Sequence, residues 1–163
     1  MKIPLYSISN ILITITSSAM SFFVFMKGPK SKTNRIWAAL TLSTAIYGFC
    51  AYMASISEDP KMAFFWWQAA YYGIILIPVF FLHFTCSFLN IKNSLLIKIT
   101  YGITFALWIL NLLRPDIFLG EVTLFFTDSK IFKAGYWVYP PSLFLYFFIV
   151  FFQFIIGAIY KTI

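Results

Sequence analysis

The chain has 163 residues, of which 61% are hydrophobic, 22% are aromatic and only 10% are charged. Soluble domains are nearer half apolar and a quarter charged, so this composition excludes an ordinary soluble fold and indicates one membrane domain. The net charge of +7 does not indicate nucleic-acid binding, because the basic residues lie between apolar segments and not on one surface.

Five apolar segments are long enough to cross a bilayer, whose hydrocarbon core of about 30 Å needs about 20 helical residues. We predict an all-α, polytopic bundle with five transmembrane helices, at about residues 3–26, 36–57, 62–91, 95–113 and 141–160 of a single domain, 1–163. The first span is rich in Ser and Thr, and Gly28-Pro29 breaks the chain after it. Residues 114–140 are predicted as an extracytoplasmic loop that contains a small hairpin.

The third span, residues 62–91, has no Asp, Glu, Lys or Arg, and its few polar residues recur on one helical face. If this row of polar residues, the polar stripe, faced lipid, its least satisfied polar groups would each cost several kcal/mol. We therefore expect the stripe to face other helices. Trp66 and Trp67 at its start could cover a ligand pocket, although such residues are more often interface anchors. The candidate ligand-binding residues are Trp66, Trp67, Gln68, Tyr72, His83, Ser87 and Asn90.

His83 is the single histidine of the chain. It could contact a ligand, bind a haem iron or sense pH, or it could simply form a hydrogen bond with a neighbouring helix, which is the more common role. A haem held by two imidazoles would need a second histidine, which the sequence lacks. We therefore expect no cofactor and no metal.

The loop charges predict the orientation in the membrane. Alternating spans put seven basic residues and no acid on one side, and five basic residues and all five acids on the other. The seven are Lys27, Lys30, Lys32, Arg35, Lys92, Lys98 and Lys161. The positive-inside rule then places the N-terminus outside and the C-terminus in the cytoplasm of a multi-pass cell-membrane protein.

Several charged residues and motifs that particular protein classes require are missing from the sequence, which limits the possible functions. No charged residue lies deep in a span, whereas proton-coupled transporters usually need one, and a retinal protein needs a buried Lys. A P-loop, a zinc ligand set and a G-x-S-x-G elbow are also missing. Composition leaves a Ser–His pair for proteolysis open, but no local motif supports one. We assign no catalytic residue.

Several hydrophobic motifs nevertheless carry a family resemblance. They are Trp66, Trp67, Tyr72, Gly73, Pro78, Phe81, His83 and Phe84 in the third span, Asn34 and Trp37 at the second, and Gly135, Tyr136 and Trp137 before the fifth. Together they resemble the N-terminal seven-helix (7TM) membrane region of prokaryotic sensor histidine kinases over essentially the whole chain. Because the sequence ends two residues after Lys161, we expect it to be truncated after the fifth helix.

The resemblance implies a signal-input domain of a two-component histidine kinase. Such a domain is not itself an enzyme, and it would relay a stimulus to a cytoplasmic kinase or PAS module in cis or in trans. The stimulus would be a small hydrophobic molecule or a peptide, and we expect it to shift the helix that contains Pro78 against its neighbours. The sequence leaves a homodimer open. The alternatives are a small oligomeric transporter or channel subunit and, less favoured, a membrane enzyme acting on lipid.

Overall fold

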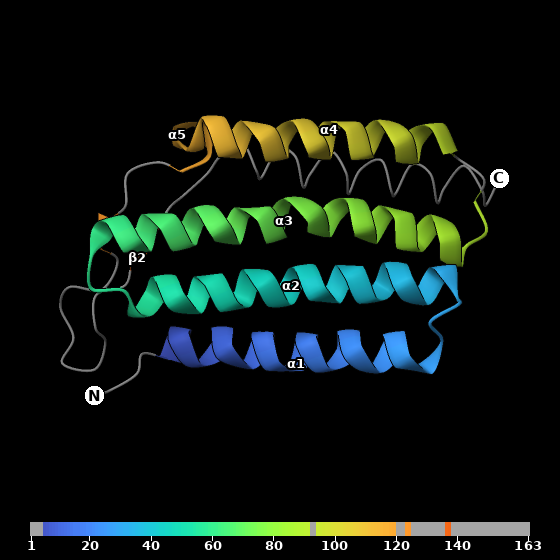
Figure 1. The fold of residues 1–163 in the computed structure, drawn as a ribbon, viewed down its shortest axis with the longest axis horizontal. Coiled ribbons are helices and arrows are strands. Elements are labelled where there is room, and N and C mark those ends of the chain that lie inside the picture. The colour runs from blue at the N-terminus through green and yellow to red at the C-terminus, as the bar shows by residue number, and fades with distance from the viewer. Residues whose placement is uncertain (1–4, 92–93, 120–122, 125–135, 138–163) are drawn as a thin grey trace.

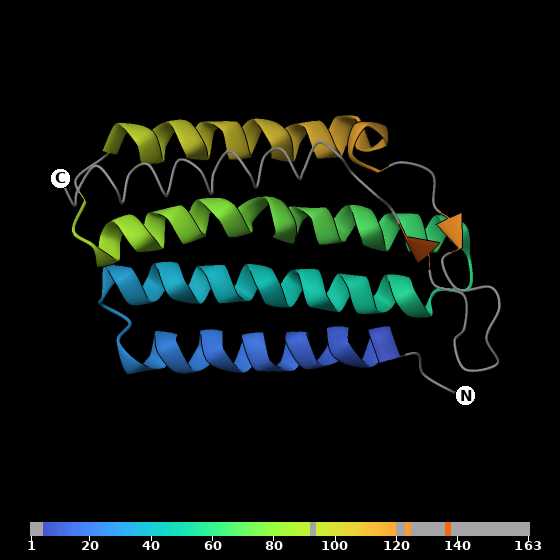
Figure 2. The ribbon, with the colours of Figure 1, turned by 180° about the vertical axis from the view of Figure 1, so that it is seen from behind.

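The computed structural model describes residues 5–91, 94–119, 123–124 and 136–137. Four long helices lie side by side in chain order, and each runs antiparallel to the one before it (Figure 1). They are α1 (Leu5–Lys27), α2 (Lys32–Ile56), α3 (Pro60–Phe88) and α4 (Ser94–Leu113). The view from behind shows the same order (Figure 2). All four are long and apolar enough to cross a membrane, which confirms a helical, multi-pass membrane protein.

Short elements follow the fourth helix. The one-turn helix α5 (Pro115–Phe118) leads to β1 (Thr123–Leu124), which pairs antiparallel with β2 (Tyr136–Trp137) at the end of the bundle where α3 begins (Figures 1 and 2). The two strands fall within residues 114–140, where the sequence predicts a small hairpin. The predicted fifth span, 141–160, lies outside the described residues, and the side of the membrane that each terminus occupies stays a prediction.

The helix ends follow from capping more than from hydropathy. The structure begins α2 at Lys32, four residues before the predicted start of the span, because the Ser31 side chain accepts a hydrogen bond from the Asn34 backbone N–H at 3.4 Å. Asp59 caps α3 in the same way, accepting from the Lys61 backbone N–H at 3.0 Å. The third helix then runs unbroken through Pro78.

Small residues bring α2 and α3 together. Gly73 of α3 packs so closely that a Cβ there would lie 2.7 Å from the Ser43 carbonyl oxygen and 2.9 Å from the Tyr47 backbone nitrogen. The adjoining core contains the fully buried Ala51, Ala54, Ala70 and Ile75. Small side chains allow this close backbone approach, which is how membrane helices gain packing energy without a hydrophobic driving force.

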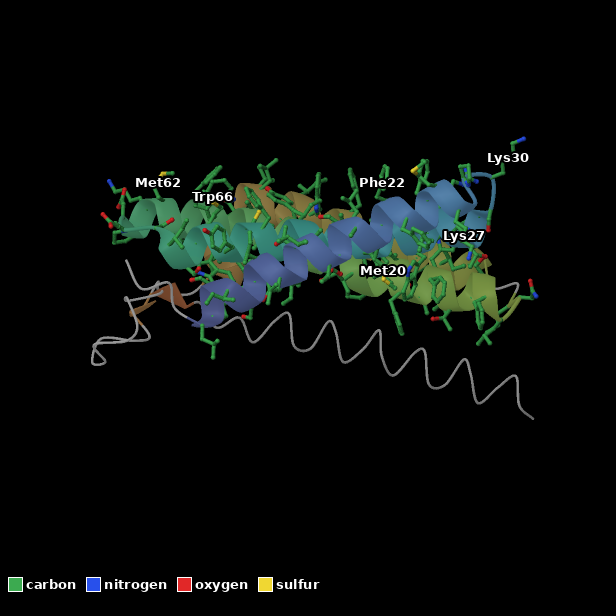
Figure 3. The ribbon with its side chains drawn as sticks, turned by 90° about the horizontal axis from the view of Figure 1, so that it is seen from below. Met20, Phe22, Lys27, Lys30, Met62 and Trp66 are labelled. Atoms are coloured by element: carbon green, nitrogen blue, oxygen red, sulfur yellow. The ribbon has the colours of Figure 1, made fainter. Side chains whose placement is uncertain are left out.

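The first helix packs on α2 through a line of small and polar contacts. The Ser7 and Ser55 hydroxyls lie 2.7 Å apart, and the Ser21 hydroxyl donates to the Ala38 carbonyl at 2.8 Å. Most of the remaining surface of α1 is apolar and exposed, including Phe22, as Figure 3 shows. This surface suits contact with lipid chains or with further helices.

Candidate functional site

The polar face of α3 meets α4 first at a reciprocal pair of amides. The Gln68 Nε2 group donates to the Asn111 backbone carbonyl at 2.9 Å, and the Asn111 Nδ2 group donates to the Gln68 backbone carbonyl at 3.2 Å. Asn111 is 0% exposed, and its side-chain oxygen has no hydrogen-bond partner among the described residues. The Asn111 amide therefore uses the second lone pair of a helical carbonyl, whereas the Gln68 amide satisfies a carbonyl in the last turn of α4, where Pro115 has no N–H to donate.

One turn further along the same interface, aromatic rings replace the amides. The Tyr72 and Trp108 rings meet edge to face with their centroids 4.8 Å apart. The Trp108 indole N–H also donates to the Tyr72 backbone carbonyl, at 3.4 Å. Residues 68 and 72 lie one turn apart on α3, as do residues 111 and 108 on α4, so the two contacts follow the antiparallel register of the helices.

His83 forms the third contact between α3 and α4. Its Nδ1 atom lies 2.9 Å from the Tyr101 hydroxyl oxygen, and the two rings meet edge to face at 5.7 Å. The imidazole is half-buried. The structure therefore gives His83 a hydrogen bond with a neighbouring helix, and its partner is the phenol of Tyr101.

The last two residues of the predicted stripe do not face α4. The Ser87 hydroxyl lies 2.9 Å from the Thr33 hydroxyl of α2. Asn90 follows the end of α3 with φ at 55°, the left-handed conformation that terminates helices. The Asn90 and Ile91 backbone N–H groups donate to the Ser87 and Cys86 carbonyls at 3.4 and 2.9 Å, the pattern of a Schellman cap. Asn90 thus ends the helix.

The two tryptophans at the start of α3 contribute to the protein core and to an aromatic cluster. Trp67 is 4% exposed and belongs to the hydrophobic core with Ala70 and Tyr71. Trp66 is half-buried and packs edge to face against Phe49 and Phe65. Trp67 therefore does not lie at an open surface, where an interface anchor would be expected.

The sequence reasoning missed the partner residues on α4. Asn111, Trp108 and Tyr101 were not predicted, nor were the buried threonines Thr100 and Thr104. Residues 100, 104, 108 and 111 recur at spacings of four, four and three, which is one helical face. The same face argument that identified the stripe on α3 would have found them on the fourth span.

Ionised groups lie outside this interface. Arg114 and Asp116 form an exposed ion pair at 2.9 Å just beyond the end of α4. Hydrogen bonds from the Arg114 guanidinium hold the pKa of the Asp116 carboxyl below its usual value. Among the described residues no group of three His, Cys, Asp or Glu side chains could hold a metal ion. The α3–α4 contact is thus built from neutral hydrogen bonds and rings.

Comparison with known proteins gives one family. A family model described as the N-terminal 7TM region of histidine kinase matches residues 10–161, which is nearly the whole chain. No curated protein and no solved structure matches it.

Proposed function

Since the chain belongs to the family of the N-terminal 7TM region of histidine kinase, we propose that it receives a stimulus within the membrane and relays it to a cytoplasmic kinase module. The sensor region is a non-catalytic part of such kinases. In this proposal the phosphoryl chemistry takes place in the module, in cis or in trans, and the chain itself contributes a change in helix packing.

The observation that carries the proposal is the difference between the two interfaces of α3. On one side, Gly73 meets the backbone of α2, and a contact between backbones admits little adjustment. On the other side, α3 packs less extensively on α4 and is joined to it by side-chain hydrogen bonds and rings. Side-chain hydrogen bonds can exchange partners, so α4 is the helix that a stimulus can shift.

We assign the response to Gln68, Tyr72 and His83, the three stripe residues that contact α4. A small hydrophobic molecule or a peptide that carries a hydrogen-bonding group would compete for the same polar atoms. Trp66 would border such a ligand near the start of α3. We keep Trp67, Ser87 and Asn90 as residues that hold this helix in place, through the core, the contact with α2 and the helix cap.

The relay can be tested by measuring autophosphorylation of the intact protein encoded by the gene, in inside-out membrane vesicles with labelled ATP. Gln68→Leu removes one interhelical hydrogen bond, and the pair Gln68→Leu/Asn111→Leu removes both. At about 0.6 kcal/mol per bond in a membrane, we expect basal output to change about threefold in Gln68→Leu and about eightfold in the double variant. The control is Leu112→Ala, which replaces a residue of α4 that follows Asn111 and is 64% exposed. This variant should leave the basal output unchanged.

Two outcomes would refute the proposal. The first is an output that is the same in the wild type, both Gln68 variants and the control under every stimulus. It would show that the α3–α4 contact plays no part in signalling. If the purified chain also carried solute across liposomes, and these variants altered the flux, the transporter or channel alternative would replace the sensor.

A further inference from the structure

Five exposed cations gather at one end of the bundle, where α1 and α3 end and α2 and α4 begin. They are Lys27, Lys30, Lys32, Arg35 and Lys98, which we call the basic end. Figure 3 shows Lys27 and Lys30 there, with Met62 at the opposite end. The carboxylates of the described residues, on Glu58, Asp59 and Asp116, belong to segments at that opposite end.

The connection between α1 and α2 holds the first of these cations in a defined turn. The Ser31 backbone N–H donates to the Gly28 carbonyl at 3.0 Å, and the Ser31 hydroxyl caps α2. The Asn34 side-chain amide lies so close over Gly28 that a Cβ there would collide with it. Lys27, Lys30 and Lys32 therefore project from a short closed turn.

An apolar and aromatic surface begins directly below the cations. The ring centroids of Trp37 and Phe84 lie 4.6 Å apart, and Phe84 stacks on Phe88 at 5.8 Å. Phe88 is 67% exposed, and Leu95 at the start of α4 is 68% exposed. Tryptophan and phenylalanine beside a fringe of lysines are typical of the depth at which lipid headgroups meet acyl chains.

We propose that the basic end binds anionic phospholipid headgroups, with lysine ammonium groups contacting the phosphate and the exposed apolar side chains contacting the acyl chains. The cations alone would also attract a soluble phosphate, but the adjoining exposed Phe88 and Leu95 favour a lipid. No ion pair joins these cations to a carboxylate of the described residues.

The test is the lipid selectivity of the purified full chain in phosphatidylcholine nanodiscs that contain trace spin-labelled phosphatidylglycerol or spin-labelled phosphatidylcholine. The motionally restricted fraction gives the ratio of the two association constants. We expect phosphatidylglycerol to be favoured several-fold and Lys30→Gln and Lys32→Gln each to lower the ratio, by up to about fivefold per charge. Lys61→Gln removes the same charge from an exposed lysine at the opposite end, and it should leave the ratio unchanged.

Several results would overturn the proposal. A ratio near one in the wild type, or an equal loss in the Lys61 control, would mean that no headgroup surface exists at the basic end. Displacement by inorganic phosphate beyond that by chloride of equal ionic strength would assign the site to a soluble anion. Displacement by poly-glutamate would assign it to an acidic protein segment. None of these readouts uses kinase output, so their failure would leave the sensor proposal standing.

Discussion

Gly73 is the position where one added methyl group tests the α2–α3 interface most directly. A Cβ there would lie 2.7 Å from the Ser43 carbonyl oxygen and 2.9 Å from the Tyr47 nitrogen. Both atoms belong to the backbone of α2 and cannot rotate away, so Gly73→Ala must push the two helices apart. Overpacking of this kind costs about 1–3 kcal/mol. We expect the free energy of unfolding to fall by that amount relative to an alanine placed in open space.

Gly102→Ala supplies that reference, because a Cβ at residue 102 of α4 would meet nothing within 4 Å. Both substitutions gain the same helix propensity, about 1 kcal/mol, so the difference between them isolates the steric cost. The assay is unfolding of the purified chain in mixed micelles by increasing dodecyl sulfate, followed by circular dichroism. Equal midpoints for Gly73→Ala and Gly102→Ala would refute the close contact between α2 and α3.

Three further predictions concern local contacts. In a double-mutant cycle, His83→Phe and Tyr101→Phe should show a coupling of about 0.6 kcal/mol in the free energy of unfolding, whereas additivity would contradict their hydrogen bond. Asn90→Val should lower the free energy of unfolding by about 1–2 kcal/mol, because φ at 55° is strained for a β-branched residue. Asn90→Gly should not lower it, and equal losses in the two variants would contradict the helix cap. Hydrogen bonds from Arg114 lower the pKa of the Asp116 carboxyl, so the ion pair stabilises the fold above the usual pKa and is lost as pH falls through the lowered value. Arg114→Gln should raise the carboxyl titration midpoint measured by NMR, and an unchanged midpoint would count against the pair.

Hydropathy and length predicted the four described helices, because a span must satisfy every backbone group internally and therefore must be helical. Hydropathy does not detect the first turn of α2, because that turn is polar. Residues 32–35 are helical because Ser31 caps them, not because they are buried. Asn90 was read as a site residue, although an Asn that follows an apolar helix is also a cap signal. Helix caps depend on residues close together in the chain, so the cap residues can be recognised in the sequence.

The neighbour that each residue contacts was harder to predict. Helical spacing correctly grouped Gln68, Tyr72 and His83 on one face of α3, but spacing alone does not say which helix covers that face. Ser87 shares the periodicity and yet bonds to α2, because the ends of α2 and α4 both flank the last turns of α3. Asn111 went unnoticed because a single Asn in an apolar span says nothing of its partner, which here is a backbone carbonyl 43 positions away.

The two faces of α3 differ in kind, and this difference decides where a stimulus can act. The repulsive energy of the backbone contact at Gly73 rises steeply when α2 and α3 come closer, so the two helices should move as one body. The hydrogen bonds to α4 are worth about 0.6 kcal/mol each in a membrane, so exchanging all four, which involve Gln68, Asn111, Trp108 and His83, costs about 2.4 kcal/mol. A ligand favours the shifted state once its affinity for that state exceeds its affinity for the resting state by more than this cost. A differential affinity of a few kcal/mol can therefore shift α4, whereas separating α2 from α3 would require breaking the core.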